Sequence, residues 1–246
     1  MSIDSPEDDA GIRRAGRAVA ETLRAMEAAA QPGVTTQDVD DAGRSVLVRH
    51  GARSAPQLVY GFPGFNLVSV NDEIVHGIPG GRRLRPGDVV KLDVTAELDG
   101  YIADAAVTIV LPPASDRARR LRDCAVAAFD AAVAAAHAGG LVSDIGGAVE
   151  HAVDGWGFSV LRELTGHGVG RVIHEEPTVP NYRDPFQRDR LTDGLVLTIE
   201  PIVAERRCRA VQSADGWTLR TSDGSLAAHH EHTVLVTPRG IELLTA

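Results

Sequence analysis

The stretch Lys91-Leu-Asp-Val-Thr-Ala-Glu-Leu-Asp-Gly-Tyr-Ile-Ala-Asp104 predicts two strands joined by a tight turn. Its centre, Asp99-Gly100, favours a two-residue hairpin turn because β-type runs flank it. Antiparallel pairing through this turn would bring Asp93, expected near the end of the first strand, close to Asp104, expected near the end of the second. Two ionised carboxylates in an apolar setting repel each other, so we expect a cation or a proton between them.

The spacing of this region recurs in the second half of the chain. Three residues that open or end its segments recur 107 positions later as a similar residue: Gly33 as Gly140, Gly87 as Gly194, and Asp93 as Glu200. Each half reads helix, helix, strand. The alternative is chance recurrence of common glycines and acids, which does not explain why order and spacing agree together. We therefore expect two related halves, at about 9–112 and 113–246.

The acidic residues of the two halves form one candidate site. Asp104 follows Asp93 by 11 residues and Glu231 follows Glu200 by 31, so the second half contains an insertion in its hairpin. A pseudo-twofold arrangement would direct all four carboxylates to one centre. Four acids can share a buried site only with bound divalent metal, and two bridged metals are a known arrangement for hydrolysis.

Length and composition bound the class of protein. The chain has 246 residues and a net charge of -9, which argues against a nucleic-acid binder and against a polybasic membrane-surface protein. Residues 1–8 are expected to form a disordered leader before a single catalytic domain over 9–246. No stretch reads as a signal peptide or a membrane span. Two widely separated cysteines, Cys124 and Cys208, favour reduced thiols and a cytoplasmic location.

Helix signals precede each of the two sheet regions. Apolar residues at spacings of three and four predict a helix from Asp9 to Ala30. Thr36 is expected to cap a second helix that ends near His50. The second half opens with a long alanine-rich helix at about 115–137, and Ser143 is expected to cap the helix that follows it.

Three histidines lie in loops where binding residues concentrate. His167 lies between Gly166 and Gly168, which allow close backbone approach and leave the imidazole accessible, so it is the best candidate for a nitrogen ligand. His76 and His174 are candidates for contact with a substrate.

Three more histidines adjoin Glu231, at positions 229, 230 and 232. Strand alternation turns His230 and His232 away from the face that carries Glu231. We expect supporting or structural roles for this group rather than metal ligation.

Taken together, these residues resemble methionine aminopeptidase of type I. The resemblance runs from about residue 10 to the C-terminus, so it is far more specific than any one motif. It rests on eight segments: Ser69-Val-Asn71 with His76-Gly-Ile-Pro79, Lys91-Leu-Asp-Val-Thr95, Asp99-Gly100 through Asp104, Thr165-Gly-His-Gly-Val-Gly170, His174-Glu-Glu-Pro177, Thr198-Ile-Glu-Pro201, Asp215-Gly-Trp217 and Glu231-His-Thr233. It implies an α+β "pita-bread" fold, in which two pseudo-twofold-related halves enclose a dinuclear metal site with antiparallel sheet inside and helices outside.

The resemblance also implies the site residues. Five are expected to hold two divalent ions (Co, Mn, Fe, Zn or Ni): Asp93, Asp104, His167, Glu200 and Glu231. Asp104 and Glu231 would bridge the two ions. The catalytic set would be Glu200, which moves the proton of the attacking water, His174, which stabilises the oxyanion, and His76, which positions or protonates the leaving nitrogen.

The side chain of the substrate's methionine needs an apolar pocket, for which Tyr60, Phe62 and Trp217 are candidates, with core packing as an almost equal alternative. The chain departs from the family at two places. Leu67 stands where a cysteine is frequent, and Ile173 stands where an aromatic residue is frequent before His174. These departures affect the shape of the pocket rather than the chemistry.

Three other interpretations were weighed. Prolidases and aminopeptidase P resemble this metal set but normally carry an additional N-terminal domain. A non-catalytic relative would be expected to lose ligand residues, and all seven expected residue types are present. An acidic scaffold without a site would leave the repeat unexplained. The partners implied are nascent polypeptide N-termini, with the ribosome as a candidate contact, in a cytoplasmic monomer that binds neither nucleic acid nor membrane.

Overall fold

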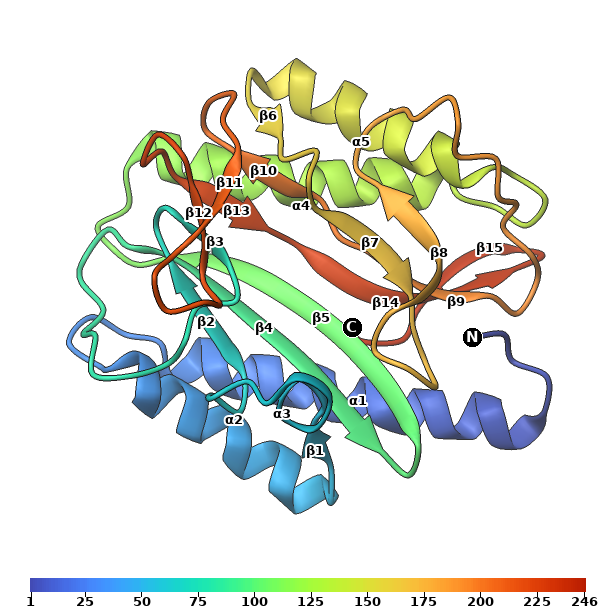
Figure 1. Ribbon diagram of the computed structural model, residues 1–246, viewed down its shortest axis with the longest axis horizontal. Helices are drawn as coiled ribbons and strands as arrows, with labels where there is room; N and C mark the ends of the chain where they lie inside the picture. The colour runs from blue at the N-terminus through green and yellow to red at the C-terminus, as the bar shows by residue number, and fades with distance from the viewer.

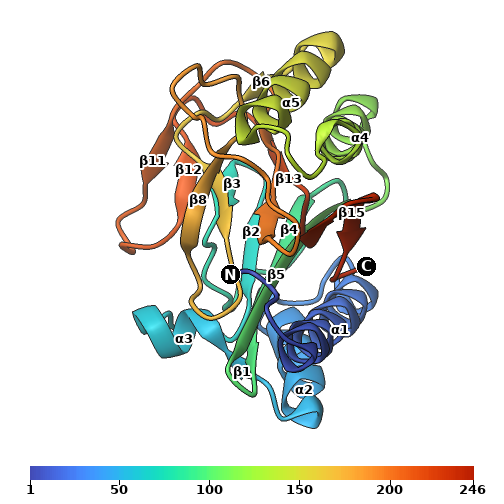
Figure 2. The ribbon, with the colours of Figure 1, turned by 90° about the vertical axis from the view of Figure 1, so that its right-hand side faces the viewer.

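A large antiparallel sheet runs through the protein, with long helices below and above it in Figure 1. The computed structural model describes residues 1–246. The helices are α1 (Pro6–Ala29), α2 (Thr36–His50), α3 (Ala55–Tyr60), α4 (Asp116–Ala135) and α5 (Val142–Trp156). Figure 2 shows that α1, α2 and α4 lie on one side of the sheet, whereas α3, β11 and β12 lie toward the other.

The strands form one nine-stranded sheet and two three-stranded sheets. The order in the large sheet is β1-β4-β5-β14-β9-β7-β8, with β2 paired to β4 and β15 paired to β14. The small sheets have the orders β13-β10-β6 and β11-β12-β3. Strand bounds are β1 (Arg53–Ser54), β2 (Leu67–Val70), β3 (Glu73–Val75), β4 (Val89–Leu98), β5 (Tyr101–Val110), β6 (Ser159–Val160), β7 (Thr165–Gly168), β8 (Glu175–Pro180), β9 (Val196–Ile199), β10 (Ile202–Ala204), β11 (Ala210–Gln212), β12 (Leu219–Thr221), β13 (Ala227–His229), β14 (Glu231–Thr237) and β15 (Gly240–Leu243). This architecture confirms the α+β fold with two halves.

The hairpin predicted from Asp99-Gly100 is the β4–β5 pair. Asp99 has φ of 53° and Gly100 has φ of 82°, and positive φ at both central residues is the type I′ turn that matches strand twist. The strands continue well past the two acids, because Asp93 lies opposite Ala106 and Asp104 lies opposite Thr95 in a register of ten pairs. The expectation that the acids lie near the strand ends is therefore wrong, and both lie in mid-strand.

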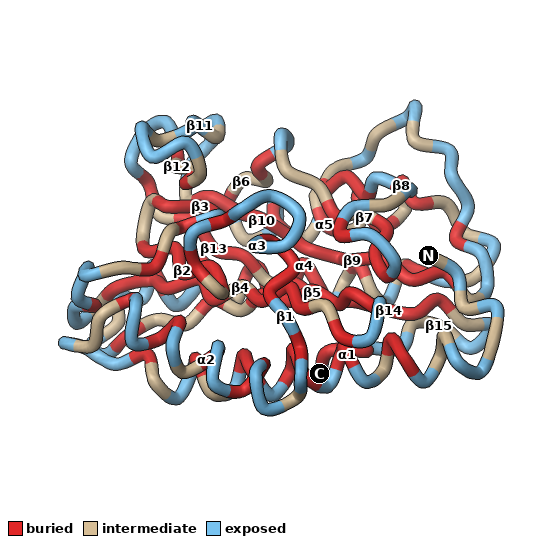
Figure 3. Tube along the Cα trace, turned by 60° about the horizontal axis from the view of Figure 1, so that its bottom comes forward, coloured by how far each residue is buried: buried red, intermediate tan, exposed pale blue.

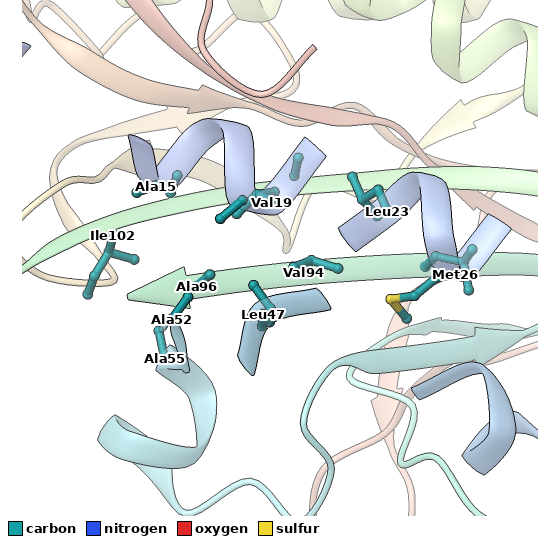
Figure 4. Close-up of a cluster of buried hydrophobic side chains, with 14 of the residues drawn as sticks. Ala15, Val19, Leu23, Met26, Leu47, Ala52, Ala55, Val94, Ala96 and Ile102 are labelled. Atoms are coloured by element: carbon teal, nitrogen blue, oxygen red, sulfur yellow. The ribbon is translucent and has the colours of Figure 1, made fainter. Parts of the chain in front are cut away.

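Each half has its own hydrophobic core. The first contains 29 buried residues and the second contains 21. In Figure 4, Ala15, Val19 and Leu23 of α1 lie along β4 and β5, and Met26 continues the same helix face. This is the face predicted by the apolar spacing of the first helix. Burial of such a side chain stabilises the fold by roughly 1.5–3 kcal/mol relative to exposure, so α1 fixes the outer face of the β4–β5 hairpin.

The first residues are held against the second half, contrary to the disordered leader expected for 1–8. The backbone N–H of Ile3 donates to the carbonyl of Gly194 at 2.8 Å, and Ser2 bridges to Leu195. The helix begins at Pro6 because Ser5 accepts a hydrogen bond from the N–H of Asp8 as the N-cap. The composition of this segment is acidic, but its backbone groups find partners at the sheet edge.

Two other helix starts differ from the prediction by one or two residues. Thr35, not Thr36, is the N-cap of α2, and it forms a capping box with Asp38. Helix α5 begins at Val142, so Ser143 lies inside the first turn instead of capping it. In both cases a neighbouring residue holds the extended backbone conformation that the cap position needs.

Burial follows the layers of the fold. Figure 3 shows the central strands as mostly buried and the outer faces of α1 and α2 and the β11–β12 hairpin as more exposed. None of the helices combines the length and apolarity that crossing a bilayer requires.

Candidate metal centre

Two carboxylates of the candidate site lie in one row across the sheet. Leu67 of β2 lies opposite Asp93 of β4, Asp93 lies opposite Ala106 of β5, and Ala106 lies opposite Glu231 of β14. Directly paired residues point to the same face, so Asp93 and Glu231 flank the small side chain of Ala106. Asp104 precedes Ala106 by two residues on β5, which places it on this face as well.

Glu200 and His167 join the row from the neighbouring strands. Glu200 follows the last residue of β9, and its Oε1 atom lies 3.5 Å from Nε2 of His167 on β7. Thr198 links them: its hydroxyl donates to Oε1 of Glu200 at 2.8 Å and accepts from the N–H of His167 at 3.0 Å. The Nδ1 atom of His167 lies 2.9 Å from the carbonyl of Gly168, which can only accept. Nδ1 therefore carries the proton, and the lone pair of Nε2 faces the acids.

The glycines beside His167 permit close strand packing. A Cβ atom on Gly166 would lie 2.6 Å from the carbonyl oxygen of Thr198, and one on Gly168 would lie 2.2 Å from that of Glu176. Both separations are shorter than real contacts allow. The sequence suggested glycines for access, and the structure shows that they also let β7 approach β9 and β8.

His229 is a site residue that the sequence analysis missed. Its side chain is 2% exposed, and its Nε2 atom lies 3.4 Å from Oε2 of Glu231 and 3.7 Å from Oε2 of Glu200. Strand alternation contained the signal, since positions 229 and 231 share a face when 230 points away. The prediction that His230 and His232 turn away is confirmed, because both pack against Phe129 with ring centroids 5.2 Å apart.

The acids and histidines form two groups able to hold a metal ion. One consists of Asp93, His229 and Glu231, and the other of Asp104, His167 and Glu231. In each group one candidate ligand atom per residue lies within 4.8 Å of the others. The two groups share Glu231, so the structure brings together all five residues that the sequence analysis expected to bind metal, with His229 in addition.

Burial and mutual repulsion disfavour the charged form of these acids. Loss of hydration, reinforced by the neighbouring carboxylates, raises the pKa values of Asp93, Glu200 and Glu231 well above their usual range. Loss of hydration raises the pKa of Asp104 to about 7, against a hydrogen bond from Thr95 that lowers it. Such a cluster is stable at neutral pH if it is protonated or neutralised by cations.

Several polar atoms at the centre have no protein partner. They are Oδ1 of Asp104 and both ring nitrogens of His229. Unsatisfied polar groups in the interior are costly, and oxygen and nitrogen donors of this kind are metal ligands. The donor set therefore fits divalent metal.

The two other catalytic candidates lie on opposite segments of the same cavity. His174 lies beside His167, with ring centroids 4.3 Å apart, and its Nδ1 atom lies 2.6 Å from the hydroxyl oxygen of Tyr60. His76 follows β3 with φ of 59°, a left-handed conformation that is strained for a residue other than glycine. Burial lowers the pKa values of both His174 and His76, which favours neutral imidazoles at neutral pH.

The cavity in front of the acids has a volume of about 700 Å³ and apolar walls. Phe62 packs edge-on against Trp217 with ring centroids 5.3 Å apart, and both line the cavity. Leu67 and Ile173, the two departures from the family, also line it. Tyr60 lies at the cavity but is 49% exposed, so its contact with His174 defines it better than apolar packing does.

Comparison with known proteins agrees with this geometry along the whole chain. Residues 10–238 match metallopeptidase family M24. The chain is 40% identical to methionine aminopeptidase 2 of Bacillus subtilis over 239 residues, which cover 96% of each protein. The structure of methionine aminopeptidase from Thermotoga maritima superimposes with a TM-score of 0.96 at 36% identity, covering 100% of this chain and 99% of that one.

A prolidase matches less completely. The prolidase from Pyrococcus furiosus has a TM-score of 0.80 at 21% identity, and the match covers 98% of this chain but 64% of the prolidase. This likeness shows that the two share the fold. Because the methionine aminopeptidases match over their whole length at far higher identity, the prolidase interpretation is not favoured.

Proposed function

The chain belongs to metallopeptidase family M24, and we infer from this that it is a methionine aminopeptidase, a hydrolase that removes the N-terminal methionine of proteins and peptides whose second residue is small. The carrying observation is the convergence of four acids and two imidazoles at the floor of a cavity with apolar walls. A free α-amino group is attracted to such an acidic floor, and a methionine side chain fits an apolar wall.

We propose that Asp93, Asp104, His167, Glu200 and Glu231 hold two divalent metal ions. Support comes from the shared position of Glu231 in both groups and from the partnerless Oδ1 atom of Asp104. When bound, such ions polarise the peptide carbonyl and lower the pKa of water so that it attacks near neutral pH.

Glu200 is the candidate base for the proton of the attacking water. Its Oε1 atom already accepts from Thr198 and lies near His167, so its orientation is fixed before substrate enters. The proton would then be transferred to the leaving nitrogen of the substrate, which His76 positions from the opposite wall. The left-handed backbone of His76 supports this role, because strained conformations are kept where the side chain must point in one direction.

His174 is the candidate donor to the carbonyl oxygen as charge develops on it. The phenol of Tyr60 donates to Nδ1 of His174, since loss of hydration raises the pKa of Tyr60 and keeps its proton in place. In this arrangement Nε2 of His174 carries the remaining proton and can donate it as a hydrogen bond. Tyr60 thereby serves orientation, and Phe62 and Trp217 are the better candidates for contact with the methionine side chain.

We also propose that the enzyme acts as a cytoplasmic monomer on nascent polypeptide N-termini, with the ribosome as a candidate contact. The relatives' activity supports the substrate, and no basic excess supports direct binding to nucleic acid. Co-sedimentation with translating ribosomes and light scattering of the purified protein test these two points.

The experiment that tests the function is release of methionine from peptides. Met-Ala-X and Met-Gly-X peptides should be cleaved with added Co, Mn, Fe, Zn or Ni, whereas Met-Leu-X and X-Pro peptides should be cleaved far more slowly. Preferred cleavage of the X-Pro peptides would instead identify a prolidase. Metal uptake without any peptide cleavage would contradict the proposed hydrolase.

A further inference from the structure

His229 is buried beside the candidate metal centre with no hydrogen bond to either ring nitrogen. The resemblance to the family assigned no ligand role to this position. We propose that His229 binds metal through Nε2, as a sixth protein ligand that gives each of the two metal positions one imidazole. The proposal rests on the metal centre inferred above and adds a residue to it.

The backbone of His229 is fixed from two sides, which leaves its ring little choice of direction. The hydroxyl of Thr108 on β5 donates to the carbonyl oxygen of His229 at 2.7 Å and accepts from its N–H at 2.8 Å. On the other side, His229 pairs with Ile202 of β10. With the strand locked, the side chain points at the acids on the row of Asp93 and Glu231.

The distances suit shared coordination better than a hydrogen bond. Nε2 of His229 lies 3.4 Å from Oε2 of Glu231 and 3.7 Å from Oε2 of Glu200. These separations exceed the usual 2.7–3.2 Å of an N–H···O hydrogen bond. Two donors that each lie about 2.1 Å from one ion at a tetrahedral angle are about 3.4 Å apart. His167 and Glu200, proposed ligands of one ion, show a comparable 3.5 Å.

The two ligand groups are equivalent in composition. Each has one acid from the β4–β5 hairpin, one histidine and the shared Glu231: Asp93 with His229, and Asp104 with His167. Without His229, the position at Asp93 would have oxygen donors only. A second imidazole favours the later first-row metals over Mn²⁺, because nitrogen donors suit Co²⁺, Ni²⁺ and Zn²⁺ and oxygen donors suit Mn²⁺.

The test compares His229→Gln with His230→Gln in the intact protein loaded with Co²⁺. His230 is adjacent in sequence but packs against Phe129 on the other face, so its substitution controls for the loss of a histidine. In paramagnetic proton NMR, the ring N–H of a ligating histidine gives a strongly shifted, exchangeable signal. Wild type and His230→Gln should show two such signals, and His229→Gln should lose one. His167→Gln should lose the other.

A second measurement needs no assignment of signals. In equilibrium dialysis with Co²⁺ and Mn²⁺ in competition, His229→Gln should lower the ratio of bound Co²⁺ to bound Mn²⁺ by at least about tenfold. His230→Gln should leave this ratio at the wild-type value, and circular dichroism should show that both variants are folded.

Two results would overturn the proposal. If wild type gives a single shifted signal that only His167→Gln removes, the metal centre exists but His229 is not its ligand. If wild type binds no Co²⁺ at all, the proposed metal centre fails and the sixth ligand with it.

Discussion

The hydroxyl of Tyr60 lies 2.6 Å from Nδ1 of His174, across 114 positions of sequence. Tyr60 ends the short helix α3, and His174 directly precedes β8, so the contact ties the two walls of the cavity together. It also fixes which nitrogen of His174 faces the reacting groups. A tyrosine proposed from sequence as an apolar wall is therefore better described as the residue that orients a catalytic histidine.

Tyr60→Phe should lower kcat about tenfold with metal content unchanged. Loss of this one hydrogen bond costs on the order of 1.4 kcal/mol in the orientation of His174, and each 1.4 kcal/mol is a factor of ten in rate. Steady-state kinetics on Met-Ala-X and metal analysis measure the two quantities. Tyr182→Phe is the matched control, since Tyr182 stacks with Arg162 away from the cavity. Equal kinetics of both variants would refute the orienting role.

His167→Ala and His76→Ala should separate metal binding from catalysis. His167 belongs to a ligand group, so its loss should remove metal and activity together. His76 lines the cavity outside both groups, so its loss should reduce kcat by about 10²-fold or more while both metals stay bound. Elemental analysis of the dialysed proteins decides the point. Normal metal content in His167→Ala would show that the ligand assignment is wrong.

Removal of metal should reverse the pH dependence of stability. The folded-state pKa of Asp104 is about 7 against 3.8 for the free side chain, so the metal-free folded protein binds protons that the unfolded chain does not. Its free energy of unfolding should therefore fall as the pH rises from about 4 to about 7. The raised pKa values of Asp93, Glu200 and Glu231 act in the same direction.

Metal binding requires these carboxylates in their ionised form, so its stabilising effect should grow over the same pH range. Thermal unfolding at pH 5.5 and pH 8, with and without saturating Co²⁺, measures the difference. The gap in Tm between the two forms should be wider by about 5 °C or more at pH 8. A gap of constant width would mean that the acids do not release protons to the metal.

Gly166→Ala should destabilise the protein and loosen metal binding. The added methyl group would lie 2.6 Å from the carbonyl oxygen of Thr198, so β7 must move away from β9 and carry His167 with it. We expect a loss of about 1–3 kcal/mol in the free energy of unfolding. Gly155→Ala on α5 is the control, because its methyl group would meet no atom within 4 Å and alanine favours the helix. Urea unfolding and metal titration compare them.

Much of the fold could be predicted because its signals are local and repeated. The Asp99-Gly100 turn fixed the β4–β5 hairpin, and the spacing of apolar residues located α1. The recurrence at 107 positions predicted two halves that meet at one site. The places where prediction failed depend on contacts from far along the chain. Residues 1–8 look solvated by composition, yet their backbone pairs with the segment around Gly194.

The site followed the same division. Acids were identified because carboxylates at related positions in both halves have few alternative explanations. His229 was missed because His230 and His232 beside it are structural, and nothing in the sequence shows that β13 ends at 229 with its backbone fixed by Thr108. The pairing of Tyr60 with His174 was also beyond reach, since side-chain partners 114 positions apart leave no trace in one sequence.

The position of β14 in the sheet has a consequence for how the protein comes to be folded. This strand lies between β5 and β9, yet it is synthesised after both. Until residues 231–237 emerge, each of these strands keeps an unpaired edge, which is a template for aggregation. Neither metal group is complete at that stage, because both require Glu231. Closure of the sheet and the onset of hydrolytic competence are thus the same late event in the birth of the chain, and a ribosome-bound fragment ending before β14 has neither.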